Sequence, residues 1–432
     1  MRILASAGVV LVCSLGASAA TPAPRTSLVS VALGGSWANA SSWSGRVSGD
    51  GRFVAYFSGA TNLTRARRSG LFLRDLRRRR TVRLGPGGVD LAVTPDARFV
   101  VVCTTAPLAR GDVPAPYGRR LEVERFLDAY VYDRRTGRIL RASVPARGRN
   151  PNDRACAGDF AGHVDVSADG RYVLFPAKAS NIVRGDTNGM TDVFVRDLRA
   201  GRTRRVSVTS PGAQANGESS ALAISADGRL AFFCSGARNM GRGPGVFVHD
   251  LRTRRTTAVS TTADGRPLSE VICLHGKAAS ADGRFVAFAT QDPDVTRSEG
   301  HRLVVKDRRT GRLDLLTPGS NGLGVGGVHA GAMSASGRYL TFGTSVSNLV
   351  PGDTNNVEDV FWFDRARRVP VRLSLRWDGS ESFTQFGSDW PAISADGRWV
   401  TWQTADSSFL PGEPQRPDGD ETLDVFIRGP LR

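Results

Sequence analysis

Four ionisable residues stand at fixed distances before a turn that recurs along this chain. Arg46 and Asp165 each lie six residues before the closing arginine of a turn, and Asp90 and His163 each lie eight residues before one. If equivalent positions of the repeats face a common axis, these four side chains converge at one place. An Asp–His pair there supports acid–base chemistry or metal binding, with arginine holding an anion, whereas a water-filled polar lining needs no ligand.

Two loops carry a second spacing with a chemical meaning, GDTNGMTDVF from Gly185 and GDTNNVEDVF from Gly352. Their clustered carboxylate and amide oxygens resemble a calcium loop, because hard cations prefer such ligands. The acidic residue that closes a twelve-residue calcium loop is missing, and Asx turns alone select Asp, Asn and Gly here. Structural turns and calcium therefore remain alternatives, and no other cofactor is expected. The calcium ligands would be Asp186, Asn188, Asp192, Asp353, Asn355 and Asp359.

The turn from which these distances are counted occurs seven times. Each copy begins with an apolar residue, continues with Ser-Ala-Asp-Gly-Arg or a close variant, and ends in a second apolar run. Its arginines recur at intervals of 46 to 73 residues, a period typical of stacked supersecondary units. They are Arg52, Arg98, Arg171, Arg229, Arg284, Arg338 and Arg398.

Each unit also contains an apolar strand that ends in Asp, a basic turn and another strand, as in DVFVRDLRAGRTRRVSV from Asp192. Alternating apolar and polar residues indicate strands, and Asp-Gly suits a tight hairpin. Four strands per unit and seven units predict an all-β fold, a seven-bladed β-propeller of four-stranded antiparallel blades.

The two ends of the chain are expected to close this ring. The last unit begins its third strand at Asp424 and has no fourth strand, whereas residues 27–33 (SLVSVAL) precede the first unit and are similar to the outer strand RVSV at 205–208. We therefore predict that the N-terminal strand completes the seventh blade.

Four cysteines occupy two equivalent pairs of positions. Cys103 and Cys234 each lie five residues after a repeat arginine, at the end of the second strand, and Cys156 and Cys273 lie just before the first strand of the following blade. These positions share one height in the blade, so we predict the disulfides Cys103–Cys156 and Cys234–Cys273. Four buried free thiols are the alternative.

The SADGR turns and the VFVRD hairpins together resemble the TolB-like family of propeller repeats, which are related in shape to WD-repeat propellers. The resemblance extends from about Leu28 to Arg428 and implies the same propeller fold. The envelope protein that names the family has a further N-terminal α/β domain that meets other translocation components, which we do not expect here. Its partners are therefore not carried over, since propellers host unrelated functions.

The first residues predict export. MRILASAGVVLVCSLGASA has a charged start, an apolar stretch and an Ala-Ser-Ala end, which is typical of a secretory signal peptide at residues 1–19. A single propeller domain would then occupy residues 20–432. We expect a secreted or cell-envelope protein without a transmembrane span, in an oxidising compartment that favours disulfides.

The formal charge of +17 is carried almost wholly by arginine, since lysine occurs only at 178, 277 and 306. The basic hairpin turns should share one face of the propeller and the acidic long loops the other. We expect the repeat arginines to pair with the aspartates that end the third strands, except in the last blade, where Gly429 replaces Asp. The basic face could attract a polyanion, or it could be a solvated surface of a compositionally biased chain.

Common enzyme signatures are absent, since the sequence contains neither G-x-S-x-G nor H-E-x-x-H. We predict a non-catalytic binding module of the envelope or exterior, acting as a single copy on a protein or an envelope glycan through the channel mouth on the long-loop face. The alternative is a propeller lyase or hydrolase for an envelope polysaccharide or peptide, with Asp90, His163 and Asp165 as reacting groups.

Overall fold

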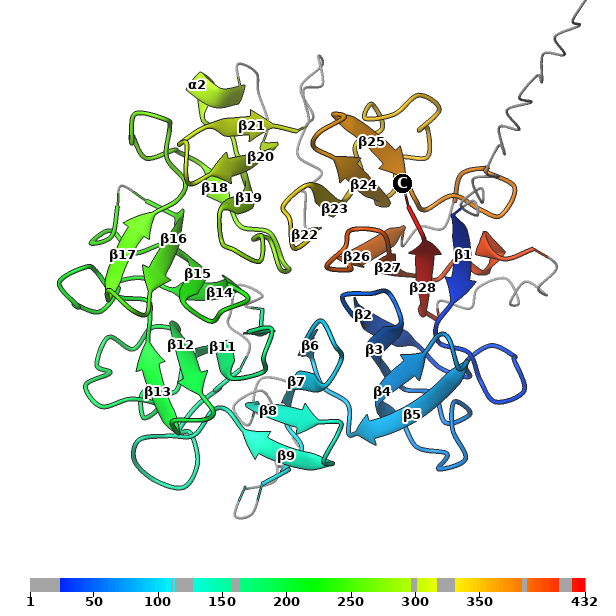
Figure 1. The fold of residues 1–432 in the computed structure, drawn as a ribbon, viewed down its shortest axis with the longest axis horizontal. Helices are drawn as coiled ribbons and strands as arrows, with labels where there is room; N and C mark the ends of the chain where they lie inside the picture. The colour runs from blue at the N-terminus through cyan, green and yellow to red at the C-terminus, as the bar shows by residue number, and fades with distance from the viewer. Residues whose placement is uncertain are drawn as a thin grey trace, which may run out of the picture.

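Seven four-stranded antiparallel sheets surround a central channel in the computed structural model (Figure 1), which confirms the predicted all-β propeller. The structure describes residues 24–109, 112, 127–156, 163–241, 243–296, 301–316, 331–382, 387–411 and 422–431. The predicted signal peptide lies outside these residues, so the division into residues 1–19 and 20–432 stays a prediction.

Six blades are built from four consecutive strands, numbered outward from the channel. Blades 1 to 3 comprise β2 (Ser42–Val47), β3 (Phe53–Ser58), β4 (Gly70–Asp75), β5 (Arg80–Gly85); β6 (Asp90–Val93), β7 (Phe99–Thr104), β8 (Asp128–Asp133), β9 (Arg138–Arg141); and β10 (Asp165–Val166), β11 (Tyr172–Ala177), β12 (Asp192–Asp197), β13 (Arg202–Arg205). Blades 4 to 6 comprise β14 (Ser219–Ile224), β15 (Leu230–Ser235), β16 (Gly245–Asp250), β17 (Arg255–Ala258); β18 (Val271–Ile272), β19 (Phe285–Thr290), β20 (Arg302–Asp307), β21 (Leu313–Leu315); and β22 (Gly331–Met333), β23 (Tyr339–Thr344), β24 (Asp359–Asp364), β25 (Val369–Arg372).

The seventh blade joins both ends of the described chain, as predicted. Its strands are β26 (Ser388–Ile393), β27 (Val400–Thr404), β28 (Asp424–Gly429) and β1 (Arg25–Leu28), with β1 antiparallel to β28. The outer strand begins at Arg25 and ends at Leu28 rather than extending from 27 to 33. Val29 still donates a backbone hydrogen bond to Val425 O (2.8 Å), after which the chain turns, with Ala32 N–H bonding Ser36 O (2.9 Å).

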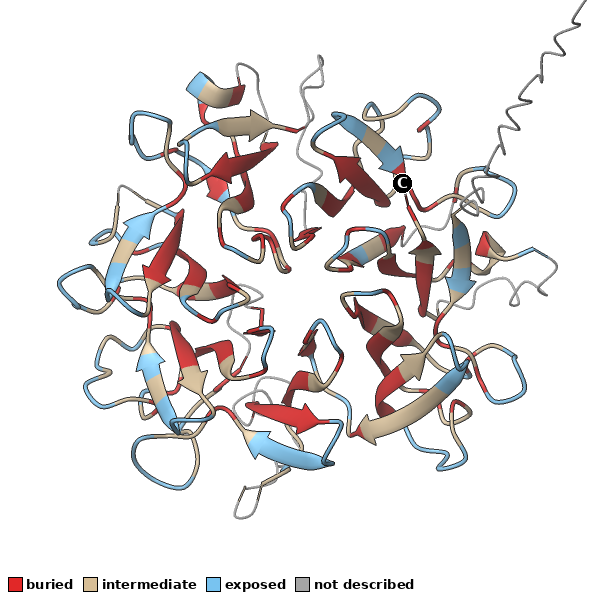
Figure 2. Cartoon of the chain, viewed as in Figure 1, coloured by how far each residue is buried: buried red, intermediate tan, exposed pale blue. Residues whose placement is uncertain are grey.

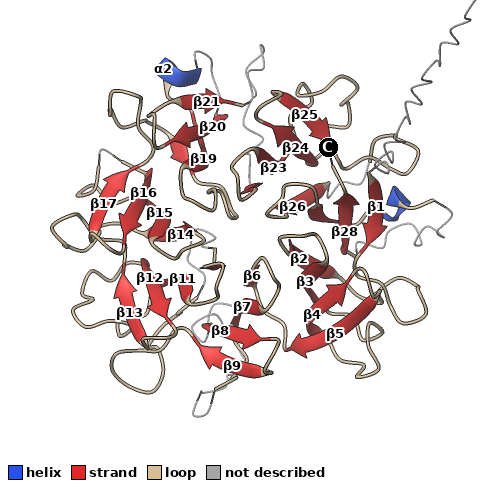
Figure 3. Cartoon of the chain, viewed as in Figure 1, coloured by secondary structure: helices blue, strands red, loops and turns tan. Residues whose placement is uncertain are grey.

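The core lies between neighbouring blades, and burial decreases from the second and third strands to the outermost strands (Figure 2). Among the residues that the structure describes, helix is confined to two short peripheral segments (Figure 3), α2 (Pro293–Thr296) and a 3-10 turn (Ser407–Phe409). Within the described ranges, no helix has the length and apolar character needed to cross a membrane.

The repeated turn is fixed by its own side chains. In blade 3, Ser167 Oγ donates to Asp169 Oδ1 (2.6 Å), Arg171 N–H donates to the same oxygen (3.0 Å), and Tyr172 N–H donates to Ser167 Oγ (2.9 Å). Gly170 has φ +75°, and a Cβ there would lie 2.0 Å from Phe99 Cδ2 of the preceding blade. Glycine is therefore required by both the backbone conformation and the packing between blades.

Neighbouring turns also bond to one another around the channel. In five turns the second residue donates its backbone N–H to the equivalent carbonyl of the next blade, as Ala168 does to Ala226 O (2.9 Å) and Ala281 to Ala335 O (2.9 Å). In blade 7 the third residue of the turn, Asp396, donates to Gly49 O instead (3.3 Å). Pro95 in blade 2 has no N–H, so it accepts from Gly49 (2.8 Å) but cannot donate to blade 3. Small residues of these turns line the channel at its turn-side end.

The six predicted Arg–Asp pairs are present on the turn face. Each repeat arginine opens a second strand and reaches the aspartate that ends the neighbouring third strand, as Arg284 does to Asp307 (2.6 Å). Arg398, opposite Gly429, forms no ion pair with any described carboxylate. The other five pairs are Arg52–Asp75, Arg98–Asp133, Arg171–Asp197, Arg229–Asp250 and Arg338–Asp364.

Both predicted disulfides are formed. Cys103 and Cys156 have Cα atoms 5.6 Å apart, and Cys234 and Cys273 have Cα atoms 6.4 Å apart. Each bond joins the end of a second strand to the next blade, so it ties two blades together on the long-loop face. Cys156 precedes the first strand of its blade as predicted, whereas Cys273 directly follows the first strand, β18, rather than preceding it.

Candidate functional site

The structure brings Arg46, Asp90, His163 and Asp165 together on one side of the channel. Asp90 Oδ2 lies 3.0 Å from His163 Nδ1 and accepts the Val164 backbone N–H (2.8 Å), while Asp90 Oδ1 lies 3.5 Å from Arg46 Nη2. Burial by itself would raise the pKa of Asp90, but the charge and hydrogen bond of His163, together with Arg46, hold that pKa below its usual value. The carboxylate orients the imidazole, leaving Nε2 as its other ring nitrogen.

Asp165 repeats this arrangement one blade further on. Its Oδ2 accepts the Ile224 backbone N–H of blade 4 (2.8 Å), and its Oδ1 lies 3.0 Å from Lys277 Nζ of blade 5. Asp90 and Asp165 therefore each connect their own blade to the next through a backbone hydrogen bond. Burial lowers the pKa of Arg46, and the two carboxylates oppose that effect.

Lys277 was not predicted as part of this cluster. It lies seven residues before Arg284, between the two positions that sequence periodicity assigned to the channel, and it is one of only three lysines in an arginine-rich chain. That rarity was the available signal.

Two small cavities occupy the channel beside these residues. One, of about 70 Å³, is lined by Arg46, His163, Asp165 and Lys277, and the other, of about 100 Å³, is walled by the alanines of the turns. Val47 and Met333, each five residues before a repeat arginine, line both cavities. Since the predicted cluster occupies the alternate positions six and eight residues before it, the innermost strands present side chains from both faces to the channel.

Trp390 lies next to this site, on a distorted part of β26. The pairing of β26 with β27 shifts register between Asp389 and Ala392, and Trp390 adopts φ +51° there. Its side chain is 37% exposed, and its ring centroid lies 6.2 Å from that of His275. Pro391 and Gly276, their chain neighbours, line the smaller cavity. Bulges of this kind redirect side chains near binding sites.

Two acids beside this bulge were also missed as a pair. Burial raises the pKa of Glu358 to about 7, with the charge of Asp389 as the next cause. Burial also raises the pKa of Asp389 to about 7, although a hydrogen bond with Gln403 acts to lower it. Glu358 Oε1 is buried without a hydrogen-bond partner among the described residues. Asp389 lies nine residues before Arg398, outside the predicted channel phase.

The two candidate calcium loops each enclose a guanidinium. Arg205 Nη1 lies 2.8 Å from Asp192 Oδ2 and 3.2 Å from Asp186 Oδ1, and Asn188 Nδ2 donates to Asp192 (3.0 Å). In blade 6 the side chains of Asp353, Asn355 and Asp359 are arranged in the same way around Arg372. Calcium at either loop stays a prediction, and it requires the guanidinium to leave the oxygens it now occupies.

The described residues contain no cluster of three or more His, Cys, Asp or Glu side chains suited to a metal ion. Of the other histidines considered, His275 contacts Trp390 and His329 lies outside the described residues.

Comparison with known proteins identifies the fold and little more. The structure is similar to that of oligogalacturonate lyase from Vibrio parahaemolyticus, with a TM-score of 0.54 and 10% sequence identity over 94% of this chain and 97% of that chain. No family model matches the sequence, and no curated protein does.

Two further structures share the architecture more loosely. TolB from Acinetobacter baumannii has 16% identity and a TM-score of 0.41 over 77% of this chain, which spans 63% of the TolB chain. Hydrazine synthase from Kuenenia stuttgartiensis has 15% identity and a TM-score of 0.43, over 83% of this chain and 91% of that chain. The propeller fold itself is established by the seven four-stranded sheets of this chain.

Proposed function

We propose that this protein is an exported binding module whose channel mouth receives a glycan of the cell envelope. The observation that carries the proposal is Trp390, a partly exposed indole held in a left-handed backbone conformation beside His275. Flat aromatic side chains offer sugar rings a large apolar contact with a polar edge. The adjoining cavity of about 70 Å³ accepts a substituent rather than a whole sugar.

Export is supported by the two disulfides, which persist in oxidising compartments. It is also consistent with the apolar N-terminal segment of the sequence.

Binding without turnover is supported by the way the clustered carboxylates are used. Asp90 and Asp165 each hold a backbone N–H of the next blade and a cationic or imidazole partner. Carboxylates committed in this way stabilise the ring of blades and are poorly placed to exchange protons with a ligand.

The proposal is tested by titrating peptidoglycan fragments and acidic polysaccharide fragments against the protein by calorimetry. We expect saturable binding of one class, weakened about tenfold or more in Trp390→Ala, because a buried aromatic contact contributes a hot spot. Trp377→Ala is the matched control, since Trp377 is 62% exposed in a loop of blade 6. Absence of binding to every fragment, or equal effects of the two substitutions, would refute it.

A second candidate, a lyase or hydrolase for a polysaccharide, is favoured by the acid–base groups at the same mouth. β-Elimination from a uronate needs a base that removes the proton from the carbon bearing the carboxylate. It also needs cations that neutralise the negative charge of that carboxylate. His163 Nε2, Arg46 and Lys277 lie at one cavity, and Glu358 and Asp389 have pKa values of about 7.

Oligogalacturonate is the first substrate to try, because one similar structure is a lyase of that name. The unsaturated product is detected by its ultraviolet absorbance. Formation of this product by the unsubstituted protein, and its loss in the His163→Ala, Asp165→Ala double variant, would support the enzyme. No turnover of oligogalacturonate or of the bound glycan would support the binding module.

A further inference from the structure

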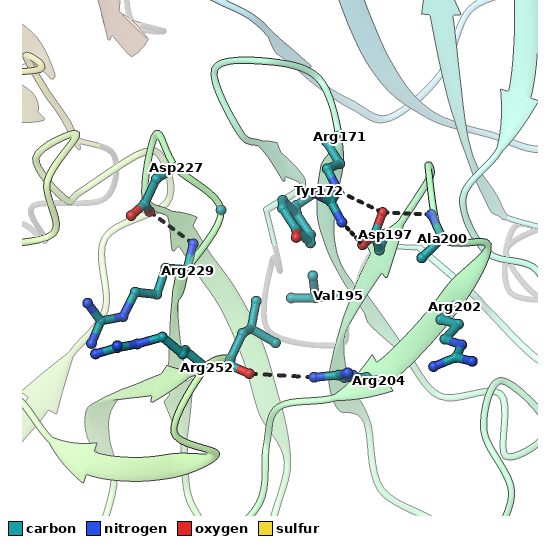
Figure 4. A pocket seen from close by; sticks show the side chains of 12 residues that line it. Arg171, Tyr172, Val195, Asp197, Ala200, Arg202, Arg204, Asp227, Arg229 and Arg252 are labelled. Carbon is teal, nitrogen blue, oxygen red and sulfur yellow. Dashed lines mark hydrogen bonds and ion pairs between the residues drawn. The ribbon is translucent and has the colours of Figure 1, made fainter.

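A groove of about 380 Å³ opens between blades 3 and 4 on the turn face, opposite the channel mouth (Figure 4). Tyr172 and Val195 lie in the middle of the view, with arginines of blade 3 on one side and arginines of blade 4 on the other. Its charged and aromatic lining consists of Arg171, Tyr172, Arg202, Arg204, Arg229, Arg252 and two carboxylates, Asp197 and Asp227. Asp227 Oδ1 accepts hydrogen bonds from Ser225 Oγ (2.6 Å) and from the Arg229 backbone N–H (2.9 Å).

The positive charge of this groove is incompletely neutralised. Asp197 holds Arg171 (2.7 Å), and Asp250 holds Arg229 (2.5 Å). The remaining three arginines of the lining, Arg202, Arg204 and Arg252, form no ion pair with a carboxylate in the part of the chain that the structure describes. Arg204 makes one long contact, to Leu251 O (3.5 Å).

Equivalent grooves elsewhere in the ring are filled by the protein itself. Between blades 5 and 6, Arg365 lies over the Phe285 ring (4.4 Å to the centroid), opposite Arg284 (4.5 Å), and donates to Gly337 O (2.6 Å). Between blades 1 and 2, Arg134 covers the Phe53 ring (4.7 Å) and donates to Ala97 O (2.9 Å).

Blade 4 lacks the arginine that fills those grooves. The filling residue follows the aspartate that ends the third strand, and in blade 4 this position is Leu251. Tyr172, the counterpart of Phe285, is covered by Arg171 (4.7 Å), and no second described guanidinium is stacked on it. The space that a side chain occupies in the other grooves is therefore open here.

Blades 1 and 3 also have leucine at this position, Leu76 and Leu198, but the facing strands differ. In each facing blade, one residue of the outermost strand pairs with the fourth residue of the third strand. This residue is Arg204 in blade 3, Leu140 in blade 2 and Ser27 in blade 7. Among these three grooves, the one between blades 3 and 4 combines the open space with an arginine on the facing strand.

We propose that this groove binds a phosphate-bearing ligand, with Arg204 and Arg252 holding the anion from opposite sides. Guanidinium groups offer paired N–H donors that match the oxygens of a phosphate, and three of them without carboxylate partners favour a multiply charged anion. This site is independent of the channel mouth, because it lies on the other face of the propeller and shares no lining residue with the channel cavities.

The proposal is tested by calorimetric titration of pyrophosphate at low ionic strength. We expect one saturable site, with Arg204→Gln and Arg252→Gln each weakening binding about tenfold, since each removes hydrogen bonds to a charged group. The control is Arg255→Gln, which removes an equal charge from the exposed end of β17 without touching the groove.

A second variant separates the groove from general attraction to a basic surface. Leu251→Arg adds a positive charge, yet it should abolish binding because the new side chain fills the groove as Arg365 and Arg134 fill theirs. General attraction predicts tighter binding instead. Thermal unfolding of the variant establishes that it is folded, and the Arg204→Gln result stands independently if it is not.

Two arms distinguish the source of the phosphate. Pyrophosphate binding indicates a soluble ligand, and sedimentation with phosphatidylglycerol vesicles indicates a lipid headgroup, provided that Leu251→Arg abolishes it. The proposal is overturned if neither probe binds, if Arg255→Gln weakens binding as much as Arg204→Gln does, or if folded Leu251→Arg binds as well as the unsubstituted protein. None of these results depends on glycan binding at Trp390.

Discussion

The two faces of the propeller use the same pair of residue types, arginine and aspartate, in opposite ways. On the turn face the aspartate is fixed under an arginine that remains in contact with water, since the side chains of Arg229 and Arg338 are 42% and 44% exposed. On the long-loop face the arginine is buried under several acids, and the side chains of Arg205 and Arg372 are 10% and 7% exposed.

This difference changes the predicted charge distribution. The loops contain the acids that the sequence assigned to an acidic face, but Asp186, Asp192, Asp353 and Asp359 are neutralised by arginines of the outer strands. On the turn face the hairpins carry arginines beyond those paired with aspartate. These four acids therefore contribute less negative charge to the long-loop face than their number in the sequence indicates.

The largest effect should come from removing a buried arginine of the long-loop face. Arg372→Gln leaves Asp353, Asp359 and Glu381 without their shared cation, and breaking a buried pair costs about 3–5 kcal/mol. Arg229→Gln breaks an exposed pair on the turn face and should cost much less, because solvent screens such a pair. Urea unfolding of both variants measures the contrast, which equal losses would contradict.

The same variant sharpens the calcium prediction. Once the guanidinium is gone, the oxygens around position 372 resemble a cation site, so calcium should raise the unfolding midpoint of Arg372→Gln and leave the unsubstituted protein unchanged. A calcium response of the unsubstituted protein would instead favour calcium bound alongside the arginine.

Disulfide loss should destabilise the long-loop face next. Replacing Cys103 and Cys156 with serine removes a cross-link between residues 53 apart, which contributes about 2–4 kcal/mol. Thermal unfolding with and without reductant provides the measurement. If reductant still lowers the unfolding temperature of the variant, that effect comes from Cys234–Cys273 alone. An unfolding temperature equal to that of the unsubstituted protein would mean that Cys103–Cys156 does not stabilise the fold.

A pH effect should distinguish the buried acids beside Trp390. Because the pKa of Glu358 is raised to about 7, the folded state keeps a proton that the unfolded chain releases near pH 4. This contribution to stability is complete below the unfolded-state pKa and is lost as the pH rises through 7. Glu358→Gln should therefore lose about 2.5 kcal/mol less stability than the unsubstituted protein between pH 5 and pH 8.

The exposed Glu270→Gln is the control for that comparison, which urea unfolding at the two pH values measures. Identical pH slopes for Glu358→Gln and the unsubstituted protein would mean that Glu358 is ionised throughout.

The smallest effect concerns the turn that departs from the repeat. Ala97 replaces the glycine at φ +52° in a fully buried position, where a side chain carries backbone strain. Ala97→Gly should raise the free energy of unfolding by about 0.5 kcal/mol. Gly170→Ala should do the reverse and more, because its Cβ would meet Phe99. A loss of stability in Ala97→Gly would indicate that packing of the methyl group dominates.

Most of the fold could be read from the sequence because it depends on local chemistry that is repeated. The Ser–Asp–Gly turns, the third-strand aspartates and the cysteine positions each recur at the same place in a blade, so one correct assignment placed the others. The outer strand of blade 7 begins two residues earlier and ends five residues earlier than predicted, because nothing repeated marks where the chain turns away after Val29.

The site was less predictable because its parts do not repeat. Asp90, His163 and Asp165 were found as exceptions at fixed positions, but Lys277 and Asp389 lie at intermediate positions that strict alternation excludes. The bulge in β26 displaces that alternation, and no residue type signals it. The calcium-like loops are ambiguous in the sequence, because the same oxygen-rich pattern also surrounds a buried arginine 13 residues beyond the aspartate.

The pairing of β1 with β28 also governs the order of assembly. These strands are made first and last on the ribosome, about four hundred residues apart, so six blades have all their strands before the seventh can exist. Until Asp424–Gly429 arrives, the nascent chain is an open arc with two unmatched edges. Maturation of this protein is therefore expected to end in a single locking event, and a chain that stops short of it exposes both edges to other molecules.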